Sequence, residues 1–168
     1  MATATFVSPE QYLATSYRPD CDYVDGEVLE RILGTKDHSR LQRELLLWFG
    51  RIGGLAAFPE QRIRVSSGRF RVPDVCVTGL PEPDEQVFTR PPYICIEVLS
   101  PEDTFPRLQQ RLDDYLDFGV PNIWVLDPSL RRAWRVTREG HFEALDGVLR
   151  TQDSSITMPI AELFPAAK

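Results

Sequence analysis

Lysine, paired cysteines and long apolar runs are all scarce in this sequence. Of its 19 basic residues only Lys36 and Lys168 are lysines, so arginine carries nearly all of the positive charge. The three cysteines, Cys21, Cys76 and Cys95, are an odd number without paired spacing. The last two lie inside apolar runs, where a reduced cysteine acts as a small hydrophobic residue. A reducing cytoplasm fits this usage best, and lysine chemistry has few candidates.

No apolar segment approaches the roughly 18 residues needed to cross a bilayer, and the N-terminus lacks a basic stretch followed by an apolar run. These absences speak against export and membrane insertion. The formal net charge of -6 speaks against a protein that coats nucleic acid through bulk positive charge. Any contact with DNA must be local or assembled by oligomerisation. With 42% hydrophobic residues, we expect one domain over residues 1–168.

The first part of the chain predicts a short helix and a hairpin. Ser8 and Gln11 have the spacing of a capping box at a helix start. Asp25-Gly26 lies between two strand-like runs, and this dipeptide suits the positive φ angles of a tight turn. We therefore expect a β-hairpin over residues 23–29.

Apolar residues at helical spacing predict two longer helices. The first runs from Asp37 to Ile52, where Gly53 and Gly54 can supply a left-handed stop. The second runs over residues 104–118 and ends at a glycine. Another short helix is expected at residues 159–164.

Strands are expected on both sides of the second long helix. The near-continuous apolar run from Tyr93 to Leu99 is typical of a central strand that is covered on both faces. Residues 122–126 form the next strand, which completes a βαβ crossover. Antiparallel pairs are predicted for residues 58–65 with 69–78 and for residues 133–136 with 142–145. The fold class is α+β or mixed α/β, a mixed sheet flanked by helices.

Two carboxylates interrupt the apolar pattern of predicted strands. Asp74 interrupts the run that begins at Phe70, and Glu97 interrupts the central strand. Ionised carboxylates are costly to bury unless they are paired or bind a cation. If the two strands are neighbours, both acids reach one edge of the sheet. Their hard oxygen ligands suit Mg²⁺ or Mn²⁺, which would hold a water nucleophile and neutralise the charge of a phosphate transition state.

A structural interpretation competes with this one. Asp74 would cap a turn after Pro73, and Glu97 would form a salt bridge with one of the many arginines. Each residue taken alone favours that interpretation, whereas the two together favour the metal site.

Four further segments occur in order along the chain. They are Pro73-Asp74-Val75, Ile96-Glu97-Val98-Leu99-Ser100-Pro101, Arg111-x-x-x-Tyr115 on a predicted helix, and Gly119-Val120-Pro121-Asn122-Ile123-Trp124-Val125-Leu126-Asp127-Pro128. Upstream, Asp25-Gly26-Glu27 is followed by His38 and an amphipathic helix. This order resembles the Uma family of restriction endonucleases within the PD-(D/E)xK nuclease superfamily, over roughly residues 8 to 136.

The resemblance implies a restriction-endonuclease-like core in which Asp74 and Glu97 bind the metal and DNA is the substrate. It also exposes a departure. The superfamily signature has lysine two residues after the glutamate, where this chain has Leu99. Relatives resemble one another in carrying the lysine on the following helix, four residues before the tyrosine, and this position is Arg111 here.

Helix geometry places Arg111 about 300° round from Leu108, at roughly 100° per residue, which is the edge of the buried face. From there a long side chain can lean toward the sheet. Arginine keeps the positive charge and can clamp a phosphate oxygen, but it does not lose a proton and is bulkier than lysine. Activity survives if the cation only neutralises charge, and is weakened or lost if it activates the water. The alternative is a surface arginine bonded to Asp114 or Asp117.

Three further residues are candidates for such a site. Glu27 corresponds to an acidic position of the family pattern and would supply a third oxygen, or else it faces solvent on its strand. His38, near the start of the first long helix, would touch a substrate phosphate or is merely polar. Gln61, on an adjacent predicted strand, would orient water.

Arginines alternate on two predicted strands. Arg62 and Arg64 share one face of the first strand, and Arg69 and Arg71 share one face of the second. They would form a local strip for DNA phosphates, or a solvated face neutralised by nearby acids.

The leading hypothesis is therefore a divalent-metal-dependent DNA endonuclease. A second is a catalytically weakened or inactive relative that keeps the nuclease fold as a binding or interaction module, since the lysine is missing and the total charge is acidic. A third is hydrolysis of RNA or another phosphodiester. A nuclease that cuts both strands would work as a homodimer.

Overall fold

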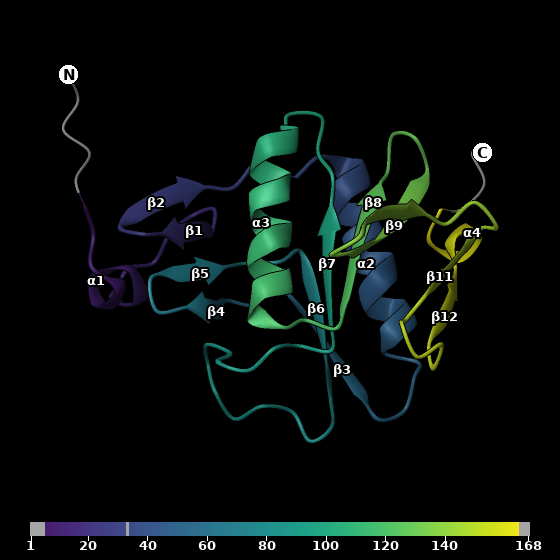
Figure 1. The fold of residues 1–168 in the computed structure, drawn as a ribbon, viewed down its shortest axis with the longest axis horizontal. Helices are drawn as coiled ribbons and strands as arrows, with labels where there is room; N and C mark the ends of the chain where they lie inside the picture. Colours follow the sequence, from purple (N-terminus) through teal and green to yellow (C-terminus); the bar gives the residue numbers. More distant parts are fainter. Residues whose placement is uncertain (1–5, 33, 165–168) are drawn as a thin grey trace.

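The apolar run around residue 96 forms β7 (Ile94–Val98), in which every residue is buried. The computed structural model describes residues 6–32 and 34–164, and β7 lies in the middle of its six-stranded sheet (Figure 1). The strand order is β10-β9-β8-β7-β6-β3, and neighbours are antiparallel except for β7 and β8. The other strands are β3 (Leu55–Pro59), β6 (Val75–Gly79), β8 (Asn122–Asp127), β9 (Arg132–Thr137) and β10 (Gly140–Glu143).

The predicted βαβ crossover is confirmed. Helix α3 (Phe105–Phe118) leads from β7 to the parallel strand β8. It ends at Gly119, whose φ of 93° puts it in the left-handed region that favours glycine. The hairpin predicted at residues 133–145 is β9 paired with β10.

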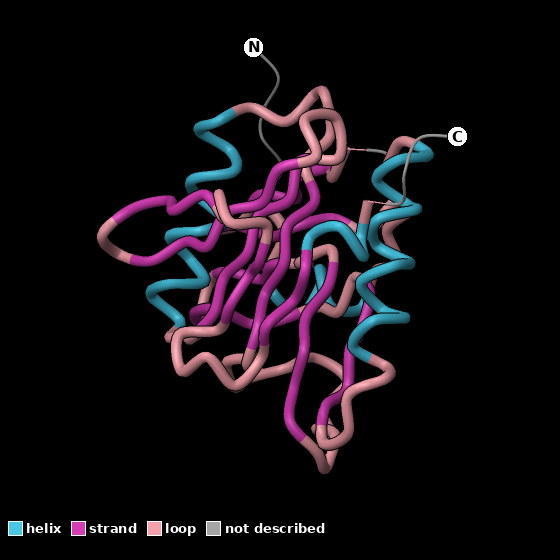
Figure 2. Tube along the Cα trace, turned by 90° about the vertical axis from the view of Figure 1, so that its right-hand side faces the viewer, coloured by secondary structure: helices cyan, strands magenta, loops and turns pink. Residues whose placement is uncertain are grey.

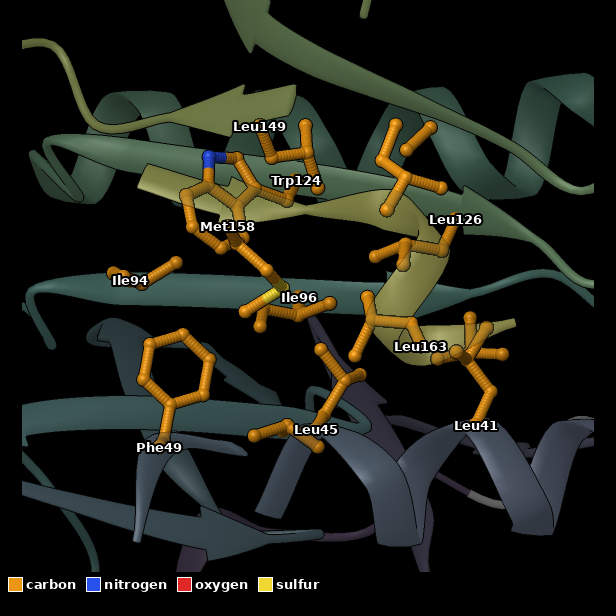
Figure 3. Close-up of a cluster of buried hydrophobic side chains, with 14 of the residues drawn as sticks. Leu41, Leu45, Phe49, Ile94, Ile96, Trp124, Leu126, Leu149, Met158 and Leu163 are labelled. Carbon is orange, nitrogen blue, oxygen red and sulfur yellow. The ribbon is translucent and has the colours of Figure 1, made fainter. Parts of the chain in front are cut away.

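Helices cover both faces of the main sheet, as the two views show (Figures 1 and 2). Helix α2 (Lys36–Phe49) packs Leu41, Leu45 and Phe49 onto one face, against Ile96 and Trp124 (Figure 3). Helix α3 packs Leu108, Leu112 and Tyr115 onto the other face. Because side chains alternate along a strand, Ile94, Ile96 and Val98 of β7 belong to the first core and Cys95 to the second. This fold is the predicted mixed sheet flanked by helices.

A second, antiparallel sheet of four strands lies beside the first, in the order β2-β1-β5-β4. Its strands are β1 (Cys21–Val24), β2 (Glu27–Glu30), β4 (Ile63–Ser66) and β5 (Arg69–Arg71). Asp25 and Gly26 both have positive φ in the turn between β1 and β2, as their sequence predicts. The capping box of Ser8 and Gln11 is also present, at the start of α1 (Pro9–Ala14).

Two expectations were wrong in detail. The runs 58–65 and 69–78 are not one antiparallel pair, because each is split between the two sheets: β4 pairs with β5, and β3 pairs with β6. Pro73, which has no N–H for a ladder, separates β5 from β6, and Glu60 has a φ of 49° between β3 and β4.

The first long helix is also shorter than expected. It ends at Phe49, and Gly50 caps it in the right-handed region, so that Gly53 and Gly54 belong to the turn before β3. Glycine stabilises a helix poorly, which favours the earlier end.

The C-terminal part adds a small pair of strands, β11 (Val148–Arg150) and β12 (Thr157–Pro159), and the predicted short helix α4 (Ile160–Leu163). Cys21, Cys76 and Cys95 are free and buried. Within the described parts of the chain, none of the helices has the length and apolar character to cross a membrane.

Candidate active site

Glu97 lies within β7, and Asp74 lies in the bend just before the neighbouring strand β6. The apolar side chains of β7 at positions 94, 96 and 98 face α2, so Glu97 faces α3. On the neighbouring strand β6, Cys76 belongs to the α3 core, and Asp74 stands two residues before it. Asp74 and Glu97 are 3% and 1% exposed. The backbone N–H of Val98 donates to Asp74 Oδ2 at 2.7 Å, which joins the two positions directly.

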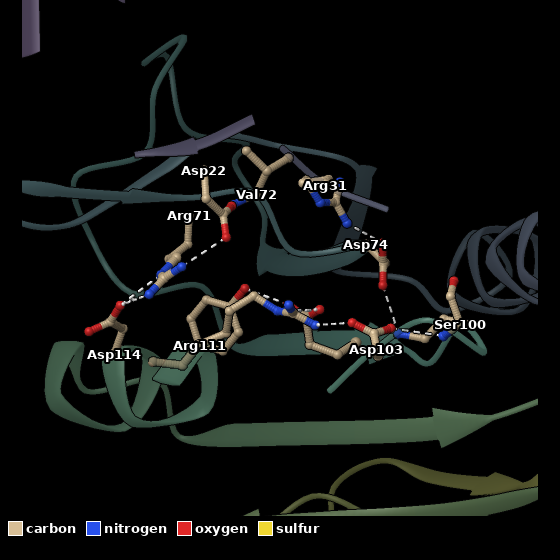
Figure 4. Close-up of polar contacts among 12 residues, drawn as sticks. Asp22, Arg31, Arg71, Val72, Asp74, Ser100, Asp103, Arg111 and Asp114 are labelled. Carbon is tan, nitrogen blue, oxygen red and sulfur yellow. Dashed lines mark hydrogen bonds and ion pairs between the residues drawn. The ribbon is translucent and has the colours of Figure 1, made fainter. Parts of the chain in front are cut away.

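Asp74 is held as a carboxylate. Its Oδ1 pairs with the guanidinium of Arg31 and lies 3.3 Å from Nε2 of His38 (Figure 4 shows Arg31 pointing at Asp74). Burial alone would raise the pKa of Asp74, but the hydrogen bond from His38 and the charge of Arg31 outweigh it and lower that pKa. In return, Asp74 outweighs the effect of burial on His38 and raises the pKa of the imidazole.

The pKa of Glu97 is shifted in the opposite direction to that of Asp74. Burial is the largest cause, and with the negative charge of Asp74 it raises the pKa of Glu97 to about 7, against the opposing charges of Arg111 and Arg31. Oε1 accepts a hydrogen bond from the Tyr115 hydroxyl at 2.6 Å, and Oε2 accepts one from Arg111 Nε at 3.1 Å. Two neighbouring carboxylates with opposite shifts are typical of functional sites.

Arg111 leans from α3 toward the sheet, as helix geometry predicts. It also donates to Asp103 at 3.3 Å, on the segment before the helix. The alternative partners are engaged elsewhere: Asp114 binds Arg69 and Arg71, and Asp117 binds Arg138. The side chain of Arg111 is therefore part of the site.

A cavity of about 50 Å³ opens between these groups. It has room for an ion with a few waters but not for a nucleotide. Carboxylates and basic side chains both line it: Asp22, Glu30, Asp74, Glu97 and Asp103, with Arg31, His38, Arg71, Arg107 and Arg111. Negative groups can bind a metal there, and the cations can meet a phosphate.

The ligands that the protein offers suit an ion such as Mg²⁺, which needs few protein ligands, better than an ion that is bound by protein ligands alone. Among residues 6–32 and 34–164, no three His, Cys, Asp or Glu side chains converge on one ion position. The protein offers two carboxylates, and Mg²⁺ commonly binds through one or two carboxylates and completes its shell with water and substrate phosphate. Asp74 and Glu97 are the residues that would hold such an ion.

Two of the other candidates lie away from the cavity. Glu27 is exposed at the turn end of β2, opposite Val24, and Asp22 on the partner strand takes the position nearer the site. Gln61 lies in the loop before β4 and not on a strand, because the strand breaks at Glu60. Its amide donates to the carbonyls of Arg62 and Gln86.

Two arginines of the predicted strip, Arg69 and Arg71, are paired with aspartates. Arg71 is 1% exposed, and it binds Asp22 and Asp114 (Figure 4), because a buried guanidinium needs carboxylate partners. Arg62 lies over the ring of Tyr12, 4.6 Å from its centroid. Arg69 shares Asp114 with Arg71, as the strand alternation predicts.

Sequence reasoning missed Arg31 and Asp22. Arg31 follows β2 in a segment without periodicity, and it meets Asp74 across 43 positions, so no local pattern points to it. Asp22 had the same signal as Asp74, an acid inside a buried strand, and could have been found. The bond from Tyr115 to Glu97 also escaped notice.

Known proteins resemble this chain in fold and in sequence. The crystal structure of a putative nuclease belonging to DUF820 from Anabaena variabilis ATCC 29413 superposes with a TM-score of 0.80 at 20% identity, covering 94% of this chain and 97% of that one. That likeness shows a shared fold. No protein of curated function matches the sequence. The Uma2 family, described as putative restriction endonuclease, matches residues 9–164, and this protein therefore belongs to that family.

Proposed function

We propose that this protein is a nuclease that hydrolyses phosphodiester bonds of DNA with Mg²⁺ or Mn²⁺ held by Asp74 and Glu97. One observation carries the proposal: a single small cavity contains the buried carboxylates of Asp74 and Glu97, together with buried Asp22, surrounded by arginines. A divalent ion bound there would lower the pKa of a bound water and offset charge on the phosphate.

The chain's own residues have separable roles in this proposal. Tyr115 fixes the orientation of Glu97 through its 2.6 Å hydrogen bond. Arg111 and Arg107 line the cavity on the side of α3, where guanidinium groups can bind phosphate oxygens in pairs. His38, whose pKa is raised by the neighbouring Asp74, lies 3.3 Å from that carboxylate. One active site cleaves one DNA strand at a time, so cutting both strands of a duplex would take a homodimer or two successive nicks.

The test is cleavage of supercoiled plasmid DNA with Mg²⁺ or Mn²⁺ and with a chelator. The protein should nick or cut the plasmid only with the metal. Asp74→Asn should lower the rate by at least roughly 100-fold, because even changes outside the ligand shell cost about 10- to 100-fold. Asp113→Asn makes the same chemical change at an exposed position of α3 and should cleave like the wild type.

Circular dichroism of both variants must show an intact fold, because Asp74 is buried. Cleavage that needs no metal, or that continues unchanged in Asp74→Asn, would show that the activity comes from elsewhere.

A second candidate is a nuclease-fold binding module without catalysis. It is favoured by the fact that every carboxylate oxygen of Asp74 and Glu97 already accepts a hydrogen bond from the protein, with Arg111 on the oxygen Oε2 of Glu97. Such a module would bind nucleic acid or a protein without metal. RNA in place of DNA is a variant of the leading proposal, and the plasmid assay repeated with single-stranded RNA separates the two substrates.

A further inference from the structure

The carboxylate oxygens of the proposed metal ligands are covered by donors of two kinds. Some donors are fixed: the N–H of Val98 is backbone within β7, and Tyr115 is 0% exposed. The others are the ends of long side chains. Arg31 and Arg111 each have a side chain 16% exposed, and both line the cavity.

A metal ion must therefore displace the arginines rather than the fixed donors. Arg31 and His38 both lie on Oδ1 of Asp74, and Arg111 covers Oε2 of Glu97, so each ligand has one arginine as a removable cation. A cation that enters the cavity competes with both guanidinium groups for the same oxygens. Binding of metal alone should be weak for this reason.

The displaced guanidinium groups need a new partner. In a half-buried cavity, a divalent ion next to released arginines is a like-charge arrangement that water screens poorly. A phosphodiester carries one negative charge and accepts paired hydrogen bonds from guanidinium. DNA therefore supplies the anion that the displaced arginines require.

The two arginines differ in the partners that remain to them after a metal ion displaces them. Arg111 also donates to Asp103, so it retains a carboxylate when it leaves Glu97. Arg31 lines a second cavity of about 120 Å³ next to Asp74 as well as the first, which gives its guanidinium room to move. The dependence on an incoming anion should therefore be stronger for Arg31.

We propose that Arg31 is a built-in counter-ion of the metal ligand Asp74 that moves to a DNA phosphate when the metal binds, so that metal and DNA bind cooperatively. This inference rests on the proposed function, because it takes Asp74 as a metal ligand. It makes Arg31 a further substrate-binding residue, and it makes the metal site self-inhibited until nucleic acid arrives.

The test is Mn²⁺ affinity, measured by electron paramagnetic resonance of free Mn²⁺, with and without a short DNA duplex of phosphorothioate backbone that resists cleavage. In the wild type the duplex should tighten Mn²⁺ binding about tenfold or more, within the usual range of coupling between sites. The same duplex with neutral methylphosphonate linkages should not. The variant Asp74→Asn serves as the control, because it measures how much Mn²⁺ binds to the DNA rather than to the protein site.

Arg31→Gln should bind Mn²⁺ more tightly than the wild type without DNA, and most of the tightening by DNA should vanish. Arg31→Lys keeps the charge and should keep most of the tightening, which guards against a simple folding defect. Arg43→Gln, an exposed arginine on α2, should behave like the wild type.

The outcomes separate this inference from the function beneath it. Full tightening by DNA in Arg31→Gln, or no gain in its affinity for Mn²⁺ alone, would overturn the counter-ion role while Asp74-dependent Mn²⁺ binding stands. Absence of Asp74-dependent Mn²⁺ binding in the wild type with DNA would overturn the metal site itself, and the inference with it.

Discussion

Arg111 is the residue on which the proposed chemistry of the site depends most. Its Nε lies 3.1 Å from Glu97, at the helix position where the family resemblance implies lysine. A guanidinium spreads its charge over a plane and holds a carboxylate in a fixed geometry, whereas an ammonium is a compact charge that can lose a proton when buried. Arginine therefore holds Glu97 more firmly and cannot take part in proton transfer.

Replacing Arg111 by lysine should reveal which of these effects matters. If the helix cation helps to activate water, Arg111→Lys should raise metal-dependent plasmid cleavage by roughly 100-fold, the lower end of what a positioned proton-transfer group contributes. Arg43→Lys provides the same exchange at an exposed site of α2 and should leave the rate unchanged. A binding module, in contrast, would show neither cleavage nor Mn²⁺ binding in either form.

At this scale the sequence was informative where a residue broke a pattern. Asp74 and Glu97 stood out because carboxylates are unexpected in predicted buried strands. Arg111 was identified through the family resemblance, and helix geometry then placed it at the edge of the buried face. Arg31 broke no pattern, because its segment has none. Its partner lies 43 positions away, and only the folded chain brings them together.

Among the elements, helix α3 is attached to the second sheet by buried ion pairs. Arg71 of β5, 1% exposed, binds Asp114 of α3 and Asp22 of β1, so one guanidinium joins the helix to the second sheet. The same helix carries Arg111 and Tyr115 into the site. The buried ion pairs thus hold the helix that positions the residues around Glu97.

Removing this guanidinium should destabilise the protein strongly. Arg71→Met leaves Asp22 and Asp114 without their shared buried cation, and breaking a buried pair costs about 3–5 kcal/mol. Arg138→Met removes an arginine from another aspartate of α3, in a pair whose side chains are 67% and 74% exposed. That change should cost less than about 1 kcal/mol. Urea unfolding of both variants measures the difference, and equal midpoints would show that the buried network does not hold α3.

Elements with strong local signals were predictable. The capping box, the Asp25-Gly26 turn and the glycine stop of α3 each follow from the backbone preference of one or two residues. The split of the two β-rich runs was not predictable from periodicity, because a strand pattern does not show which other strand a segment pairs with. Pro73 was the available signal, since a proline without N–H marks the point where the chain leaves one sheet for the other.

Over the whole molecule, the site lies where the two sheets and two helices meet. The second sheet contributes Asp22, and Arg31 comes directly after the last residue of β2. Helix α2 contributes His38, the main sheet Glu97, and α3 Arg111. The fold class followed from element order, whereas the convergence of these groups depends on pairing between distant strands, which no local pattern encodes.

The most direct test is a crystal structure of the protein with Mn²⁺ and a short DNA duplex, with the metal located by its anomalous scattering. We predict one Mn²⁺ at about 2.0–2.3 Å from carboxylate oxygens of both Asp74 and Glu97, with Arg31 moved to a phosphate. Asp74 and Glu97 still paired with Arg31 and Arg111, at a Mn²⁺ concentration that saturates the protein elsewhere, would contradict the metal site.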